Sequence, residues 1–196
     1  MHPATLRRLS FFGSYTTNME GQQVILRALE ATDLELLTRW NFDPMVTAFF
    51  SPRLPNTLTE QKEWMLRQLE GGPKKKFMII DKTSKEAIGV LGMMGIDHVN
   101  KNAEIGITIG NISFWGKPQP KEAFSLVLQF LFQQFNMHMV YLQVFDSNIR
   151  AIRFFEKFGF RRDGIRRECV YAHGAYHSIM MMSLLKQEFE QIDMKQ

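Results

Sequence analysis

The spacing of apolar residues changes along the segment from 105 to 160. Ile105, Ile107 and Ile109 alternate with small residues over a length typical of a strand. The next apolar residues recur at three- and four-residue steps, as on one face of a helix: Phe124, Leu128, Leu131 and Phe135. A second strand, MVYLQVF, and a helix that begins near Asn148 follow. The pattern predicts a strand–helix–strand–helix unit.

Shorter elements are predicted before this unit. Residues 24–29 form a candidate edge strand, and Thr32 is a candidate N-cap for an amphipathic helix that starts at Asp33. A second helix is expected from Thr59 to about Glu70. The loop between the two helices contains Phe49 and Phe50, which either line a pocket or close over the core.

Hairpins are predicted on both sides of the central unit. Residues 77–80 and 87–96 form one pair, and 161–170 and 176–185 form another. The 87–96 strand contains glycines that commonly mark a bulge or the close approach of another backbone: Gly89, Gly92 and Gly95. Together with the central unit, these hairpins predict an α/β fold with a single mixed, largely antiparallel sheet.

Composition narrows the class of protein. The chain has 196 residues, of which 45% are hydrophobic, enough for one domain with a substantial core. The formal net charge of +4 does not indicate nucleic-acid binding. Cys169 is the single cysteine, which excludes an intramolecular disulfide, and no Cys/His spacing suggests a metal. No apolar run reaches the roughly 18 residues that cross a bilayer, so we expect a cytoplasmic protein without a membrane-spanning segment.

Short motifs occur in a fixed order from Arg27 to Phe189. Those of the central unit are Ala103 to Gly106, Trp115 to Lys117, Glu122-Ala123, Asn148, Ala151, Glu156-Lys157 and Gly159-Phe160. Their order and spacing resemble the GNAT superfamily of N-acetyltransferases, most closely its branch of ribosomal-protein alanine and serine acetyltransferases and spermidine acetyltransferases. The resemblance spans residues 23–190, which leaves 1–22 as an N-terminal extension outside the family fold and 191–196 as a C-terminal tail.

The resemblance implies a binding site for acetyl-CoA, a co-substrate. In this family the cofactor lies where two central parallel strands splay apart, here 104–109 and 139–145. The backbones of Ile107, Thr108 and Ile109 would contact the pantetheine arm, and the turn from Gly116 to Ala123 would meet the pyrophosphate at a helix N-terminus. Asn148 would hydrogen-bond the arm, and it is equally a candidate N-cap of the second helix.

The phosphate turn departs from the family pattern at Pro118 and Pro120. Each proline lacks an N–H donor, and Pro118 favours an extended conformation at the residue before it. Losing one hydrogen bond to a charged group costs about 1.5–3 kcal/mol. The remaining N–H groups, with the ammonium groups of two lysines, are expected to compensate in part: those of Lys117, Gln119, Lys121 and Glu122.

Acetyl transfer requires a base for the amine and a proton for the departing thiolate. Glu104 is the first candidate base, ahead of Asp97 and His98, although a surface carboxylate paired with a lysine is an equal interpretation. Many family members carry a tyrosine acid seven residues after the asparagine. That position is Phe155 here, which is expected to contact the cofactor but cannot donate a proton. Other tyrosines are possible substitutes: Tyr141, Tyr171 and Tyr176.

Three functional hypotheses follow from the resemblance. The first is direct acetyl transfer from acetyl-CoA, without a metal, to a primary amine: a protein N-terminus, a polyamine or an amino sugar. The second is a catalytically impaired binding or regulatory module, suggested by Pro118, Pro120 and Phe155. The third changes the donor to a longer acyl-CoA. By analogy with relatives, a homodimer that pairs through residues 176–185 is a further expectation.

Overall fold

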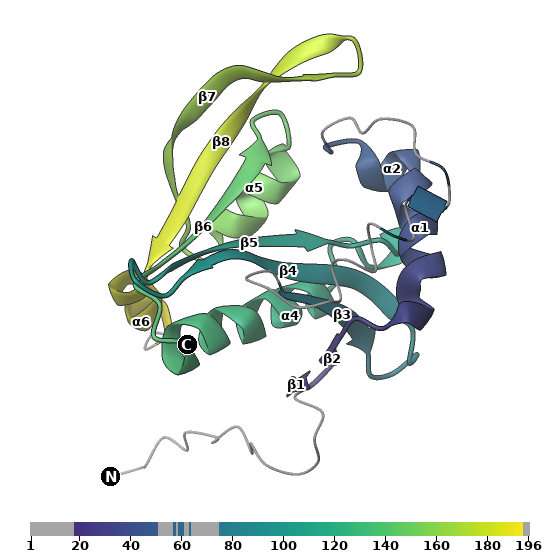
Figure 1. Ribbon diagram of the computed structural model, residues 1–196. Helices are drawn as coiled ribbons and strands as arrows, with labels where there is room; N and C mark the ends of the chain where they lie inside the picture. The colour runs from purple at the N-terminus through teal and green to yellow at the C-terminus, as the bar shows by residue number, and fades with distance from the viewer. Residues whose placement is uncertain (1–17, 51–56, 58, 61–62, 64–74, 194–196) are drawn as a thin grey trace.

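The computed structural model describes residues 18–50, 57, 59–60, 63 and 75–193, and within them the chain forms one open sheet (Figure 1). The strand order is β1-β2-β3-β4-β5-β6-β8-β7. Neighbouring strands are antiparallel except β5 and β6, which are parallel. The predicted mixed, largely antiparallel sheet is confirmed. The strands are β1 (Met19–Glu20), β2 (Val24–Ala28), β3 (Lys75–Asp81), β4 (Ala87–Asp97), β5 (Asn102–Thr108), β6 (Met139–Phe145), β7 (Arg161–Ala172) and β8 (Ala175–Leu185).

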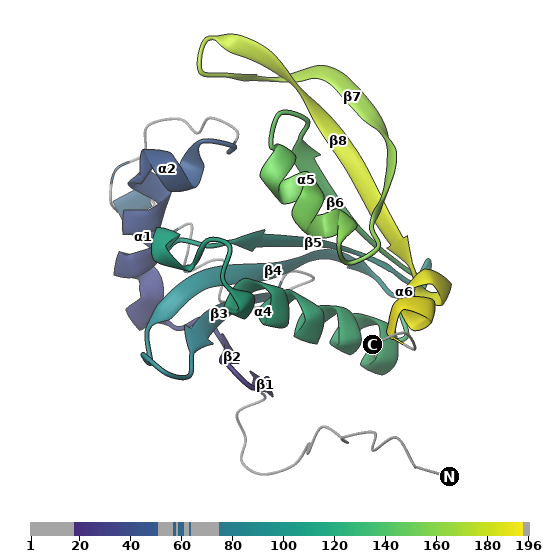
Figure 2. The same cartoon turned by 180° about the vertical axis from the view of Figure 1, so that it is seen from behind.

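Helices cover both faces of the sheet. Figure 2 shows α4 and α5 on the face turned toward the viewer, while α1 and α2 lie at the end of the sheet far from α6. The helices are α1 (Leu34–Phe42), α2 (Pro44–Thr47), α4 (Pro118–Gln129), α5 (Ile149–Glu156) and α6 (Lys186–Asp193), with short turns η1 (Ala31–Asp33), η2 (Ile112–Phe114) and π-helical η3 (Phe130–Gln134). Of the predicted helix at 59–70, most residues lie outside the described ones.

The main core lies between the sheet and helices α4 and α5. Phe124 of α4 is fully buried and packs against Phe155 and Phe160, with ring centres 5.4 Å and 5.9 Å away. Because side chains of a strand alternate between faces, Ile79 joins this core while its neighbour Met78 packs with Leu37 of α1 on the other face. The alternation of side chains along β3 therefore places apolar residues in two layers, one on each face of the sheet.

Of the three β4 glycines for which the sequence predicts a bulge or a close backbone approach, two have such a role. A side chain at Gly89 would collide with the Thr108 carbonyl, so the glycine permits the close approach of the end of β5. Gly95 has φ +54 and lies in a register shift between Met94 and Asp97, which is a bulge. A side chain at Gly92 would make only ordinary contact with Lys76.

Two predictions about the N-terminal part, the edge strand and the N-cap of the first helix, are wrong. Residues 24–28 are not the sheet edge, because β1 pairs outside them. Thr32 is not the N-cap of α1, because it lies within η1 and Asp33 takes that place. The side chain of Asp33 makes no capping hydrogen bond to α1. Its carboxylate instead accepts from the two terminal guanidinium nitrogens of Arg27 in β2, at 2.6 Å and 2.7 Å.

The carboxylate of Asp33 is buried and charged. Burial raises its pKa, but the hydrogen bonds from Arg27 and from the Glu30 N–H outweigh this, so the pKa lies below its usual value. A carboxyl group whose pKa is lowered on folding stabilises the fold above its unfolded pKa, and loses this contribution as the pH falls through the folded value.

We predict that Asp33→Asn destabilises the protein at pH 7 by about 1.5–3 kcal/mol, the range for a hydrogen bond to a charged group. The difference from wild type should shrink as the pH falls below about 4, because Asp33 of the unfolded chain then becomes protonated, while the folded carboxylate, whose pKa is lowered, stays charged until the pH falls further. Urea unfolding at pH 7 and pH 3 measures both values. Equal differences at the two pH values would contradict the charged pair.

Candidate functional site

The parallel strands β5 and β6 separate along their length. They pair only at Asn102, Ala103 and Glu104, opposite residues 139–141. Beyond this point β5 remains paired with β4 up to Thr108, and β6 remains paired with β8 up to Phe145. The facing edges of residues 105–108 and 142–145 therefore have no strand partner, which leaves backbone N–H and C=O groups directed into a gap. The predicted splay between the two central strands is confirmed.

A cleft of about 1260 Å³ opens at this separation. It extends between the end of β5 and the start of α5, and then toward α1 and α2. Most residues predicted for the site line it: Glu104, Ile107, Thr108, Ile109, Gly116, Lys117, Lys121, Asn148 and Phe155. These residues therefore lie together around the separation of the two strands, and their roles stay predictions.

The two remaining predicted residues, Gln119 and Glu122, hold α4 against the sheet. The Gln119 side-chain amide donates to Asp81 at 3.1 Å. The Glu122 carboxylate accepts from the backbone N–H of Gln22 and, at 2.8 Å, from that of Gln23. Their side chains thus fix the start of α4, and neither residue is among those that line the cleft. A cofactor contact through their backbone N–H groups stays a prediction.

Both prolines of the turn fit the start of α4. Pro118 is the first helical residue, after Lys117 as the N-cap, and Pro120 is the third and is buried. The first N–H groups of a helix have no intrahelical partner, so the prolines do not disturb the helix, although they remove two donors. Lys117 is extended, as predicted, but its N–H donates to the Phe114 carbonyl at 3.2 Å. This N–H therefore already has a partner, and its predicted contact with the cofactor stays a prediction.

Trp115 and Arg150, which the site prediction did not include, contact each other and line the cleft. The Trp115 indole N–H donates to the Ile109 carbonyl at 3.0 Å, so this carbonyl already has a partner. The Arg150 guanidinium carbon lies 3.8 Å from the centre of the Trp115 ring. One signal could have identified Arg150: a cation in the first turn of a helix is unfavourable beside the positive end of the helix dipole, so it calls for another role.

Asn148 is the N-cap of α5. Its side-chain oxygen accepts from the Ala151 N–H at 3.1 Å, which confirms the structural interpretation. This bond uses the carbonyl oxygen, whereas the donors of the amide are on its nitrogen. Because Asn148 also lines the cleft, its capping role and its predicted contact with the cofactor are compatible.

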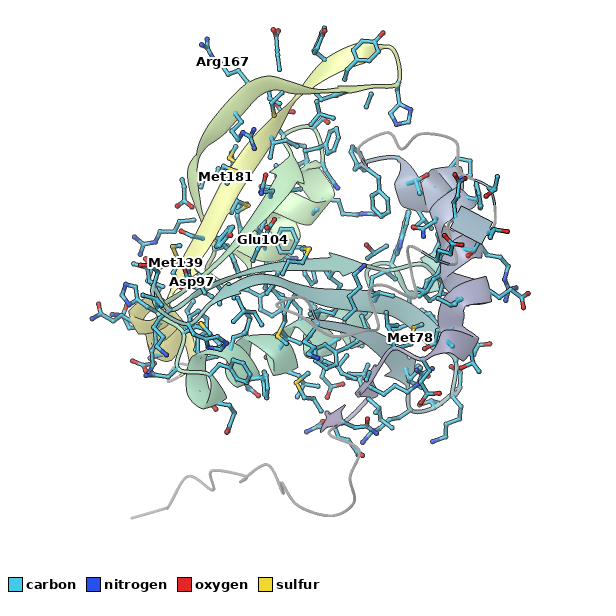
Figure 3. The ribbon with its side chains drawn as sticks, in the orientation of Figure 1. Met78, Asp97, Glu104, Met139, Arg167 and Met181 are labelled. Carbon is cyan, nitrogen blue, oxygen red and sulfur yellow. The ribbon has the colours of Figure 1, made fainter. Side chains whose placement is uncertain are left out.

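Glu104 is the best placed of the three candidate bases. It lies where β5 and β6 separate, lines the cleft and accepts from the Gln143 side-chain amide at 3.2 Å. Asp97 instead closes the β4–β5 turn, where hydrogen bonds from Asn100 hold its pKa below the usual value. His98 lies in the same turn, next to Phe135. Figure 3 labels Glu104 and Asp97 on neighbouring strands, with Asp97 nearer to α6.

Phe155 occupies the position at which the family has its tyrosine acid. It is 6% exposed, lines the cleft and belongs to the aromatic core around Phe124. Tyr141, Tyr171 and Tyr176 are not among the residues that line the cleft. Burial, followed by the charges of Glu104 and Asp97, raises the pKa of Tyr141. Among the described residues, no tyrosine hydroxyl reaches the cleft to replace the missing acid.

The α1–α2 side of the cleft is apolar. Phe49, 40% exposed, meets the ring of Phe145 on β6 with centres 6.4 Å apart. Trp40 lies against Gly110, where any side chain would collide with the indole. Both aromatic residues line the cleft, so the interpretation of Phe49 as part of a pocket wall is favoured over closure of the core.

The chain is similar in sequence and fold to known proteins. A family model described as an acetyltransferase (GNAT) domain matches residues 23–161. An uncharacterized N-acetyltransferase of Bacillus licheniformis, p20, is 30% identical, over 86% of this chain and 96% of that protein. The spermidine N(1)-acetyltransferase of Vibrio cholerae is 25% identical, over 85% and 95% respectively. A crystal structure of the Vibrio cholerae spermidine N-acetyltransferase with CoA and spermine has a TM-score of 0.78 and 24% identity, over 87% of this chain and 99% of that one.

The chain therefore belongs to the GNAT acetyltransferase family, and its fold and the resemblance seen in the sequence are confirmed. It is an acetyltransferase of the kind that uses acetyl-CoA. No helix in the described part of the chain is long and apolar enough to cross a membrane. The described residues also contain no group of three or more His, Cys, Asp or Glu that could hold a metal ion.

Two substitutions at Asn148 separate its two roles. We predict that Asn148→Ala lowers the free energy of unfolding by about 1 kcal/mol, because the cap of α5 is lost. Asn148→Asp should retain stability, since aspartate caps equally well, but should weaken CoA binding about threefold to tenfold through loss of the amide donor. Thermal unfolding and calorimetric titration measure the two effects. If Asn148→Asp binds CoA with unchanged affinity, Asn148 serves only as the cap of α5 and its amide does not donate to the cofactor.

Proposed function

We propose that this protein transfers an acetyl group from acetyl-CoA to a primary amine by direct attack of the amine on the thioester. The observation that carries the proposal is the separation of β5 from β6 beyond Glu104. It creates a cleft with two unpaired backbone edges, which suits a linear chain of amides such as the pantetheine arm. Bound acetyl-CoA would supply the electrophilic thioester, with Ile107, Thr108 and Ile109 along the arm.

The charge of the cleft also suits this cofactor. Among the described residues that line it, the acidic ones are Glu30 and Glu104, and the basic ones are Lys76, Lys117, Lys121, Arg150, Arg153, Lys157 and Arg166. CoA carries a pyrophosphate and a further phosphate, and an excess of cations raises the local concentration of a polyanion. The arrangement therefore supports a phosphate-bearing ligand in the part of the cleft between α4 and α5.

In the proposed reaction the amine nitrogen loses two protons, and the departing thiolate gains one. An alkyl amine has a pKa of about 10, so it must lose a proton before its nitrogen can attack. Glu104 would accept this proton directly or through water, and the neutral amine would then attack the carbonyl carbon of the thioester. As the C–N bond forms and the C–S bond breaks, the nitrogen would lose its second proton to water. The thiolate would then take a proton from water or from another ammonium group, because Phe155 has no hydroxyl. The missing acid slows this step without preventing it.

The acceptor belongs to the class of primary amines, with a protein N-terminus, a polyamine and an amino sugar as candidates. Similarity to spermidine acetyltransferases supports a polyamine. Among the described residues, the wall around Trp40, Phe49 and Phe145 is mainly apolar, which supports an amine attached to an apolar group, such as a peptide N-terminus. One experiment therefore compares turnover on the three candidate acceptors.

The proposal is tested by calorimetric titration with acetyl-CoA, followed by turnover on one acceptor of each class. We expect micromolar binding and turnover well above the buffer rate with at least one acceptor. Acetyl-CoA should outperform succinyl-CoA and longer acyl donors. Binding without turnover on any amine would favour the regulatory-module alternative, which the absence of a hydroxyl at Phe155 motivates. Absence of binding would exclude both.

We further predict that Glu104→Gln lowers kcat at pH 7 by a factor of about 10²–10⁴, the usual contribution of a general base. Affinity for acetyl-CoA should change little, because the glutamine occupies the same space. The defect should shrink toward pH 10, where the amine is deprotonated without help. Glu86→Gln, which removes an exposed carboxylate from the β3–β4 turn, is the matched control. Equal kcat values in both variants would exclude Glu104 as the base.

A further inference from the structure

Two cations at the cleft are held on aromatic rings. The Arg150 guanidinium lies 3.8 Å from the centre of the Trp115 ring, and the Lys117 ammonium lies 4.5 Å from the centre of the Phe114 ring. Both rings belong to the turn between β5 and α4, and both cations line the cleft. The turn in which two prolines remove backbone donors is therefore also the turn whose aromatic rings contact two side-chain cations.

Their place in the helices is electrostatically unfavourable without a ligand. Lys117 is the N-cap of α4, and Arg150 is the second residue of α5, so each lies at the positive end of a helix dipole. Within the described part of the chain, neither residue forms a salt bridge with a carboxylate. An anion between the two helix ends would compensate both charges and both dipoles.

The geometry of Arg150 leaves its hydrogen-bond donors available. A guanidinium that stacks on a ring uses its face, whereas its five N–H groups lie around its edge. These edge donors match two oxygens of one phosphate. Trp115 cannot turn away without losing its own hydrogen bond to the Ile109 carbonyl, at 3.0 Å. The ring thus holds the guanidinium at the end of β5, where the two strands are separated.

We propose that Arg150 binds a phosphate of the CoA cofactor, that Trp115 is its positioning residue, and that together they replace the backbone donors that Pro118 and Pro120 lack. This inference rests on the proposed function. Lys117, on Phe114, adds a second cation from the opposite helix. The chain would then bind phosphate mainly through side chains that aromatic rings hold in place, in a turn with few free backbone N–H groups.

Calorimetry of variants with two ligands tests the role of Arg150. Arg150→Gln should weaken CoA binding at least tenfold and leave the binding of pantetheine, which has no phosphate, within about twofold. Arg150→Lys should be intermediate, because an ammonium keeps the charge but not the planar pair of donors. Arg167→Gln is the control: it removes one positive charge from the β7–β8 hairpin, outside the residues of the cleft (Figure 3), and should bind CoA as wild type does.

A double-mutant cycle tests the role of Trp115. Trp115→Leu should weaken CoA binding about threefold to tenfold in the wild-type background, and less than about twofold when Arg150 is already glutamine. A purely structural role would give the same factor in both backgrounds and would overturn the positioning role. If Trp115→Leu does not fold, Trp115→Phe, which keeps a ring but loses the bond to Ile109, takes its place in the cycle.

The possible failures are distinguishable. Wild-type affinity in Arg150→Gln would overturn this inference alone, because CoA binding and the proposed activity would both remain. Equal losses for CoA and pantetheine would also overturn it, since a phosphate contact affects only CoA. If the wild-type protein binds no CoA at all, the proposed function fails together with the inference.

Discussion

The site depends on the point at which hydrogen bonding between β5 and β6 stops. Each strand is held on its outer side, β5 by β4 and β6 by β8. At the closed end, the N–H groups of His138 and Met139 both donate to the Lys101 carbonyl, at 2.6 Å and 3.1 Å. Beyond Glu104 the two strands follow their outer partners in different directions. An unpaired backbone edge is costly when it is buried, so the separation makes sense only where a ligand or water pairs with it.

Residues without side chains help to keep the cleft open. The end of β5 approaches β4 at Gly89, and the residue after Ile109 approaches Trp40 at Gly110, where a methyl group would collide in both cases. Trp115 then takes the Ile109 carbonyl as its hydrogen-bond partner. These contacts draw the end of β5 away from β6 and toward α1. The position of the end of β5 is therefore fixed by packing within the protein, before any ligand contributes.

Local signals explain what the sequence could predict. The alternation of Ile105, Ile107 and Ile109 and the capping side chain of Asn148 each depend on a few neighbouring residues, and both were recognised. Tertiary contacts explain what was missed. Thr32 and Asp33 are both of a residue type that caps helices, but Thr32 lies within η1, and the carboxylate of Asp33 pairs with Arg27 of β2, a contact that no local pattern shows. Arg150 and Trp115 lie 35 positions apart in the sequence, so their contact follows from the fold and from no local pattern.

Pro118 and Pro120 remove two donors from a helix start at which we propose that phosphate binds. Backbone N–H groups bind phosphate well because the helix already fixes their direction. A long cationic side chain normally loses rotamer freedom when it binds, which offsets part of the gain. Stacking on a ring restricts that freedom before the ligand arrives, as Trp115 does for Arg150 and Phe114 for Lys117. Aromatic residues beside the turn thus give side-chain donors part of the preorganisation that the prolines removed from the backbone.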